Sequence, residues 1–169
     1  MARPNSSTYA PYYETYIKKV PEDNVNEALK KNTEVFLDFL ENLPEAKSDY
    51  AYAPGKWTLK EVLLHLSDAE RIFSYRALRI ARNDQTPLAG FEEDEYVPYS
   101  NASYRTLASI IDELKVVRTS TQILFNSFNA DALDRMGTAS NHPVGVCALG
   151  FIIAGHTYHH MQIIKERYL

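Results

Sequence analysis

The sequence predicts an all-α protein, a four-helix bundle with long connections between the second and third helices and between the third and fourth. Four long segments carry apolar residues at the three- and four-residue spacing of an amphipathic helix. No stretch alternates apolar and polar residues over a useful strand length, and the sequence has no internal repeat. We therefore expect one domain over residues 1–169, long enough to bury a hydrophobic core without disulfides or a structural metal.

The first two helices have clear boundaries. Residues 24–43 form the first, and Pro44 ends it because proline cannot continue a helix. Its apolar positions are Val25, Leu29, Val35, Phe36, Phe39, Leu40 and Leu43. Thr58 and Glu61 stand at the spacing of a capping box, which predicts that the second helix begins there. No Gly or Pro interrupts it before about Arg82.

The other two helices are separated by polar connections. Residues 84–102 contain two Pro, one Gly and the acidic run EEDE, so they predict a long connection in which the acidic run is solvated surface. The third helix should begin near Asn101 or Ser103 and reach about Phe128. A second connection covers residues 129–145, and the last helix should begin near Pro143 or Val144 and run close to the C-terminus.

Composition excludes several classes of protein. The net charge of −4 gives no concentrated basic face for nucleic acid. No apolar run approaches the roughly 18 residues of a membrane span, and the N-terminal residues lack the apolar core of a signal peptide, so we expect a cytoplasmic protein without a membrane partner. The only cysteine, Cys147, cannot form an internal disulfide and is expected to be a small buried residue rather than a nucleophile.

The last helix carries three histidines, and two of them share its apolar face. At about 100° per residue, His156 and His160 fall within about 20° of Leu149, at the centre of the apolar stripe, whereas His159 lies at its edge. Two imidazoles at i and i+4 can bind one ion, because their Cβ atoms are about 5–6 Å apart. Without an ion or another partner, burying both rings would cost free energy. The alternative interpretation is that these are hydrogen-bonded core histidines.

A third ligand would have to come from another helix. His65 is the leading candidate, on the flank of the apolar stripe of the second helix, where a bundle position can still face the interior. His142 is the rival, but it lies in a connection beside proline and is expected to face solvent. Asp68 and Glu61 lie one turn either side of His65 and could orient its ring, although Glu61 is expected to serve the capping box instead. Glu70 and Arg71 are expected to form ordinary surface ion pairs.

Three neutral imidazoles predict a mononuclear site with an open coordination position, able to activate water or a thiol. Thr157 follows His156 where a zincin would need glutamate, and no E-x-x-H pair supports a di-iron centre. Zinc or nickel is expected, and iron is compatible with the same ligands. The sequence does not indicate a general base.

The segments KWTLKEVLLHLSDAER, GFEEDEY and AGHTYHH, in that order, resemble the DinB-like (YfiT-type) superfamily of four-helix bundles. The resemblance covers nearly the whole chain. It implies a divalent metal bound by His65, His156 and His160, and a homodimer. It also implies an activity of the kinds found in that superfamily, which are thiol transfer with bacillithiol or mycothiol and metal-dependent hydrolysis. It implies no DNA polymerase.

Two functions from different classes follow. The first is a metal-dependent thiol S-transferase or hydrolase acting on a small molecule. A thiol cofactor would need a polar, partly basic pocket mouth, to which Arg76, Arg79 and Arg82 could contribute, although these arginines are expected to be solvated surface. The second is a non-catalytic bundle that binds a metal or a small ligand. A metal whose removal unfolds the protein would favour the second.

Overall fold

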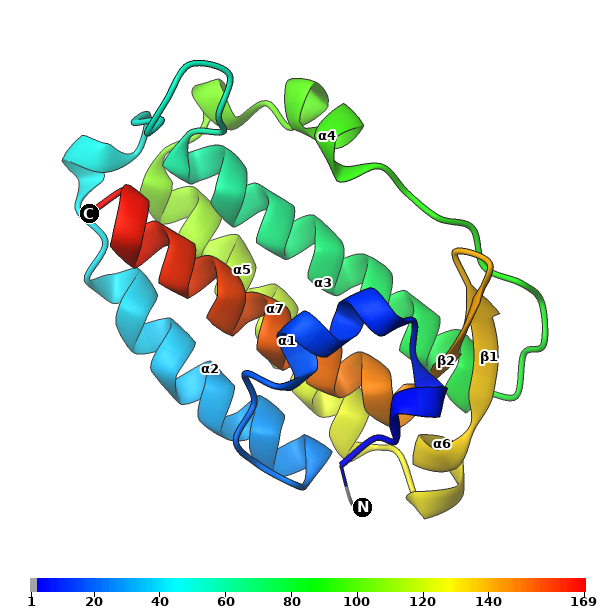
Figure 1. The fold of residues 1–169 in the computed structure, drawn as a ribbon. Helices are drawn as coiled ribbons and strands as arrows, with labels where there is room; N and C mark the ends of the chain where they lie inside the picture. Colours follow the sequence, from blue (N-terminus) through cyan, green and yellow to red (C-terminus); the bar gives the residue numbers. More distant parts are fainter. Residues whose placement is uncertain (1–2) are drawn as a thin grey trace.

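The computed structural model describes residues 3–169 and has the predicted architecture, a mostly helical bundle with one small sheet (Figure 1). The four long helices are α2 (Val25–Glu41), α3 (Leu59–Ala81), α5 (Leu107–Asn126) and α7 (Val146–Arg167). The connecting segments contain three short α-helices, α1 (Glu14–Ile17), α4 (Glu93–Tyr96) and α6 (Ala130–Asp134). They also contain a β-hairpin formed by β1 (Met136–Ala139) and β2 (His142–Gly145). No helix in the described part of the chain is long and apolar enough to cross a membrane.

Local sequence signals set the beginnings of three of the long helices. The Asn24 side chain accepts hydrogen bonds from two backbone amides at the start of α2. The capping box of Thr58 and Glu61 is formed at the start of α3, as predicted. The third helix begins later than expected, since residues 102–104 form a separate 3-10 turn and Thr106 caps α5.

The short hairpin was not predicted, because the sequence has no alternation of useful strand length. β1 and β2 pair antiparallel around Ser140 and Asn141, both of which have the positive φ angles of a tight hairpin turn. Each strand has only four residues, too few for a visible alternation. Because β2 uses residues up to Gly145, α7 begins at Val146 rather than at Pro143 or Val144.

α7 is the central helix, and residues 146–157 are buried on every side. It packs against α2, α3 and also α1, which lies across it (Figure 1). The predicted stripe around Leu149 was therefore too narrow, because a fourth face of the helix is covered by α1. Gly155 permits this close contact, since a Cβ there would lie 2.2 Å from the backbone oxygen of Tyr16.

Gly155→Ala is therefore expected to lower the free energy of unfolding by about 1–3 kcal/mol, as overpacked sites do. The clash is with backbone, so no side-chain rotation relieves it and α1 must move away from α7. Urea unfolding followed by circular dichroism measures the change. Gly90→Ala is the control, because its nearest contact would be Ser140 Oγ at 3.4 Å. An unchanged midpoint for Gly155→Ala would show that α1 is not packed as described.

A buried arginine joins all four long helices. Arg118 on α5 is fully buried and donates to both carboxylate oxygens of Glu70 on α3 at 2.8–3.1 Å. It also donates to Asn32 on α2 at 2.5 Å and to Thr157 on α7 at 2.8 Å. The prediction of a surface role for Glu70 is therefore wrong, whereas Arg71 is exposed and pairs with Glu113, as a surface residue would.

Candidate metal centre

Three histidines from two helices meet in the core, and they are the three that the sequence selected. His65 Nε2 lies 3.0 Å from His156 Nε2, and His160 Nε2 lies 3.0 Å from the same atom. One ring nitrogen from each residue falls within 4.8 Å of the others. Zn–N bonds near 2.0 Å place two nitrogens of a tetrahedral site about 3.3 Å apart, so this arrangement fits one divalent ion. Their role as ligands stays a prediction.

Burial keeps the three rings in the neutral form that binds metal. Burial, together with the neighbouring imidazoles, lowers the pKa of His156 well below its usual value. Burial also lowers the pKa of His160 to about 3 and that of His65 to about 4. At neutral pH the lone pairs are therefore available, and no proton has to be displaced before a metal binds.

Aromatic side chains surround the cluster and limit its contact with water. The Trp57 ring lies 5.0 Å from the His65 ring, and the Tyr16 and Phe73 rings lie 5.2 and 6.0 Å from the His156 ring. Sequence reasoning missed Tyr16, because α1 is too short to show periodicity. The tyrosine-rich N-terminal segment was the only available signal.

The remaining histidines lie outside the cluster. His142 is exposed on β2, as expected, and its ring meets that of Tyr12 at 6.4 Å. His159 is partly buried and its ring lies 5.2 Å from that of Tyr16. The structure thus separates His156 and His160 from His159 in the way that the helical geometry predicted.

The two carboxylates nearest in sequence to His65 differ in role. Glu61 accepts a hydrogen bond from the Thr58 backbone at 2.7 Å, so it serves the capping box, as predicted. Asp68 lines a cavity together with His65, and burial raises the pKa of its carboxyl, with Arg71 opposing the rise. No hydrogen bond between Asp68 and His65 is formed among the described residues.

The acidic run borders the cluster. Its residues are exposed, as expected, and most of them form the short helix α4, which contacts α3. Glu93 lines the same cavity as His65, and Asp94 lines a second cavity of about 230 Å³ with His160 and Trp57. Both charges oppose the lowering of the His65 pKa. The run is therefore solvated and also part of the wall of the site.

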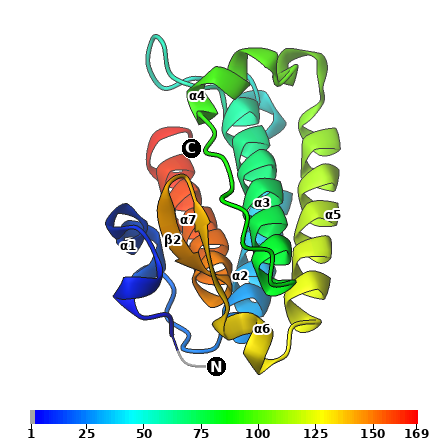
Figure 2. The same ribbon diagram turned by 90° about the vertical axis from the view of Figure 1, so that its right-hand side faces the viewer.

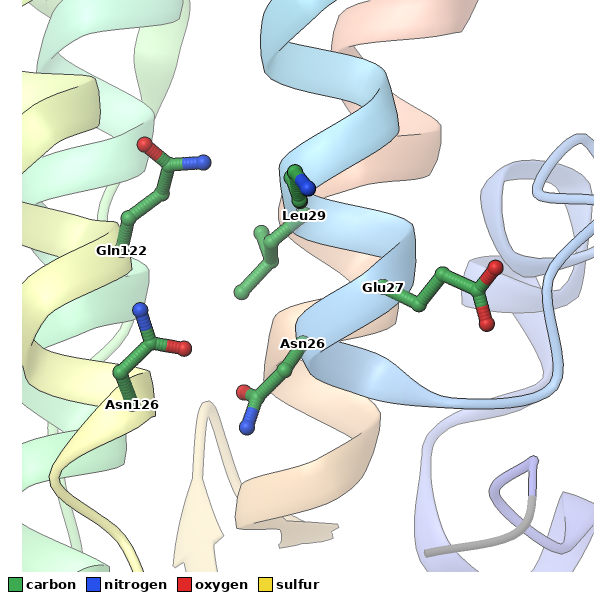
Figure 3. A pocket seen from close by; sticks show the side chains of 6 residues that line it. Asn26, Glu27, Leu29, Gln122 and Asn126 are labelled. Carbon is green, nitrogen blue, oxygen red and sulfur yellow. The ribbon is translucent and has the colours of Figure 1, made fainter.

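A cavity of about 320 Å³ between α2 and α5 lies apart from the histidines (Figure 3). Gln122 and Asn126 on α5 face Asn26 and Leu29 on α2 across it, and the Glu27 side chain points away. Its lining consists of three amide side chains with Leu29, Glu27 and Lys30, and among the described residues it holds no group of metal ligands. It offers no chemistry that competes with the histidine cluster.

Three arginines and one cysteine complete the predicted residues. Arg76 is buried, so the expectation of solvated surface is wrong for it. Arg79 pairs with Asp84, and Arg82 is exposed, with its guanidinium over the Phe128 ring. Cys147 is buried, and burial raises the pKa of its thiol to about 11, which disfavours a nucleophilic role.

Comparison with known proteins identifies related folds. Residues 28–164, which include all three histidines of the cluster, match the DinB superfamily. YfiT from Bacillus subtilis, described as a probable metal-dependent hydrolase with an unusual four-helix bundle topology, superposes with a TM-score of 0.71 at 16% identity, over 96% of this chain and 89% of its own.

A mycothiol-dependent maleylpyruvate isomerase superposes with a TM-score of 0.69 at 11% identity. That match covers 91% of this chain but only 62% of the isomerase, so the isomerase has a substantial part without a counterpart here. At these identities the likeness establishes the fold alone. No curated protein sequence matches the chain.

Proposed function

This chain belongs to the DinB superfamily, and on that premise we propose that it is a metal-dependent enzyme whose divalent ion is bound by His65, His156 and His160. The observation that carries the proposal is the convergence of three Nε2 atoms, two pairs of them at 3.0 Å, in a buried and aromatic-walled pocket. Zinc or nickel is the proposed ion, and iron is compatible with the same ligands.

A bound ion would supply a Lewis acid that lowers the pKa of water or of a thiol at its open position. The protein supplies the rest. The three ligands carry no charge, so they do not themselves neutralise a bound cation. The Trp57, Tyr16 and Phe73 rings pack beside the His65 and His156 imidazoles and limit their contact with water. A low dielectric around the site strengthens its electrostatic effects.

The proposed reaction is thiol transfer to an electrophile or hydrolysis of a small molecule. Support for the two alternatives comes from the two structural neighbours, one described as mycothiol-dependent and one as a probable hydrolase. The cavity that contains His160 and Trp57 has room for a small substrate beside the cluster. A homodimer, a cytoplasmic location and a single domain over residues 1–169 stay predictions.

The test compares metal-free, zinc-loaded and nickel-loaded protein in two assays, thiol transfer to a chromogenic aryl halide and hydrolysis of nitrophenyl esters. We expect one activity to rise by about 100-fold or more on metal loading, which is the lower end of the range that a single catalytic group supplies. His65→Ala should lose it, and His142→Ala, the exposed control, should keep it. A protein that binds metal but shows no metal-dependent rate in either assay would instead be a non-catalytic binding module.

A further inference from the structure

A further cavity lies along α3, beyond the metal centre. It is an open cavity of about 360 Å³, lined by residues of α3, by residues 86–91 and by Tyr96. Residues 86–91 belong to the connection that runs back along α3 (Figure 2). Two arginines, Arg76 and Arg79, line the cavity, and its described lining contains no aspartate or glutamate. The connection is hydrogen-bonded to the hairpin. The Leu88 amide donates to the Thr138 carbonyl at 2.9 Å, and the Leu88 carbonyl accepts from the Ser140 amide at 3.0 Å.

Arg76 is unusual because it is deeply buried without a carboxylate partner. It is 2% exposed, and within residues 3–169 no carboxylate oxygen lies within ion-pair distance of its guanidinium. One terminal nitrogen donates to the Ala89 carbonyl at 2.8 Å and to Ser140 Oγ at 3.1 Å. By contrast, the buried Arg118 is paired with Glu70. Buried charges are normally paired, since burying a lone charge is costly.

The neighbours of Arg76 are neutral and polarisable. Its guanidinium carbon lies 5.9 and 5.8 Å from the centres of the Phe73 and Phe91 rings. Such contacts partly offset the cost of burying a cation, and they leave its positive charge in place. Arg79 adds a second positive charge to the cavity, but it is already engaged by Asp84 and Tyr75. The charge that lacks a counterion is that of Arg76.

This cavity adjoins the metal centre. His65 and Arg76 are eleven residues apart on α3, so they lie within about 20° of one another on the same helix face. The Phe73 ring contacts the His156 ring at 6.0 Å and lies under the Arg76 guanidinium, so one ring separates the cluster from the arginine. Phe91 and Tyr96 line both this cavity and the one that contains His65.

We infer that Arg76 binds a carboxylate of the substrate while the reacting end of the same molecule lies at the histidine cluster. The inference rests on the proposed function and specifies its substrate class, an elongated small molecule with a carboxylate remote from its thiol or scissile group. The charges of the protein at the histidine cluster and at the Arg76 cavity agree with this orientation of the substrate. Acidic α4 borders the cluster, whereas the described lining of the cavity beyond it has two arginines and no carboxylate, so that cavity favours an anionic group.

Glutathione capped by S-methylation is a suitable probe, because its carboxylates are present but it has no free thiol to bind the metal. The protein as purified, with its metal, is titrated with this compound and with its diethyl ester, and binding is followed by amide chemical shifts. We expect the acid to bind at least about tenfold more tightly than the ester, with shifts in α3 and residues 86–91, as charge-assisted hydrogen bonds would give.

Arg76→Met should abolish the preference for the acid, and Arg76→Lys should retain part of it because the charge remains. Arg82→Met is the matched control and should bind the acid and the ester as wild type does. Arg82 is exposed at the C-terminal end of α3 and does not line the cavity. If Arg76→Met does not fold, the inference is tested by comparing the affinities for acid and ester in wild type and in Arg76→Lys.

Equal binding of acid and ester by wild type, no binding of either, or an equal loss of both in Arg76→Met would overturn the inference. The titration needs no turnover, so its result is independent of the two activity assays. Acid preference without metal-dependent activity would refute only the proposed function. Activity without acid preference would refute only the role of Arg76.

Discussion

Replacing His160 with alanine is expected to lower the affinity for zinc by more than about 100-fold and to remove metal-dependent activity. Loss of a partner that merely orients a ligand already costs about 10–100-fold, so loss of a ligand should cost more. The helix should survive, since alanine is the best helix former and His160 is only partly buried. Competition with a chromophoric chelator measures the affinity, and circular dichroism measures the helix content.

The neighbouring residue supplies the control. His159 lies on the same helix and its ring is 5.1 Å from that of His160, but it is not part of the cluster. His159→Ala should therefore keep its zinc affinity within a few-fold of wild type. If His160→Ala bound zinc as tightly as His159→Ala does, the assignment of the three ligands would be wrong.

The second large effect is expected at the buried ion pair. Arg118→Met should lower the free energy of unfolding by about 3–5 kcal/mol, because it leaves the Glu70 carboxylate buried and unpaired. It also removes the hydrogen bonds to Asn32 on α2 and Thr157 on α7, which connect the helices next to His156. Urea unfolding followed by circular dichroism gives the value.

Two further variants test whether the loss of stability comes from the unpaired buried charge of Glu70. The double variant Arg118→Met/Glu70→Leu should recover most of the loss, since replacing a buried pair by apolar residues is often neutral. Arg71→Met, which removes an exposed ion pair with Glu113, should cost no more than about 1 kcal/mol. A loss below about 1 kcal/mol for Arg118→Met would show that this network is not the central link between the helices.

The sequence predicts those features that depend on short-range spacing. The capping box of Thr58 and Glu61 is a local pattern, and the structure confirms it. The shared face of His156 and His160 follows from the geometry of one helix, and the two rings do meet. His65 could be placed only as the leading candidate, because its meeting with His156 spans 91 residues and depends on how two helices pack.

The features that the sequence does not predict depend on contacts between distant segments. Glu70 and Arg118 are 48 residues apart, and nothing near either one distinguishes a buried pair from two surface charges. Arg76 is covered by the connection that follows α3 and by the hairpin, neither of which has a periodic pattern. α1 is likewise too short for a pattern, so the covered fourth face of α7 could not be anticipated.

The proposed function depends on one divalent ion bound by His65, His156 and His160. Elemental analysis of untagged protein, purified without chelator, beside the His156→Ala variant tests it most directly. We expect about one divalent ion per chain in wild type, as in mononuclear sites with three protein ligands, and its loss in the variant. Full metal content in the variant, or none in wild type even after zinc or nickel is added, would contradict it.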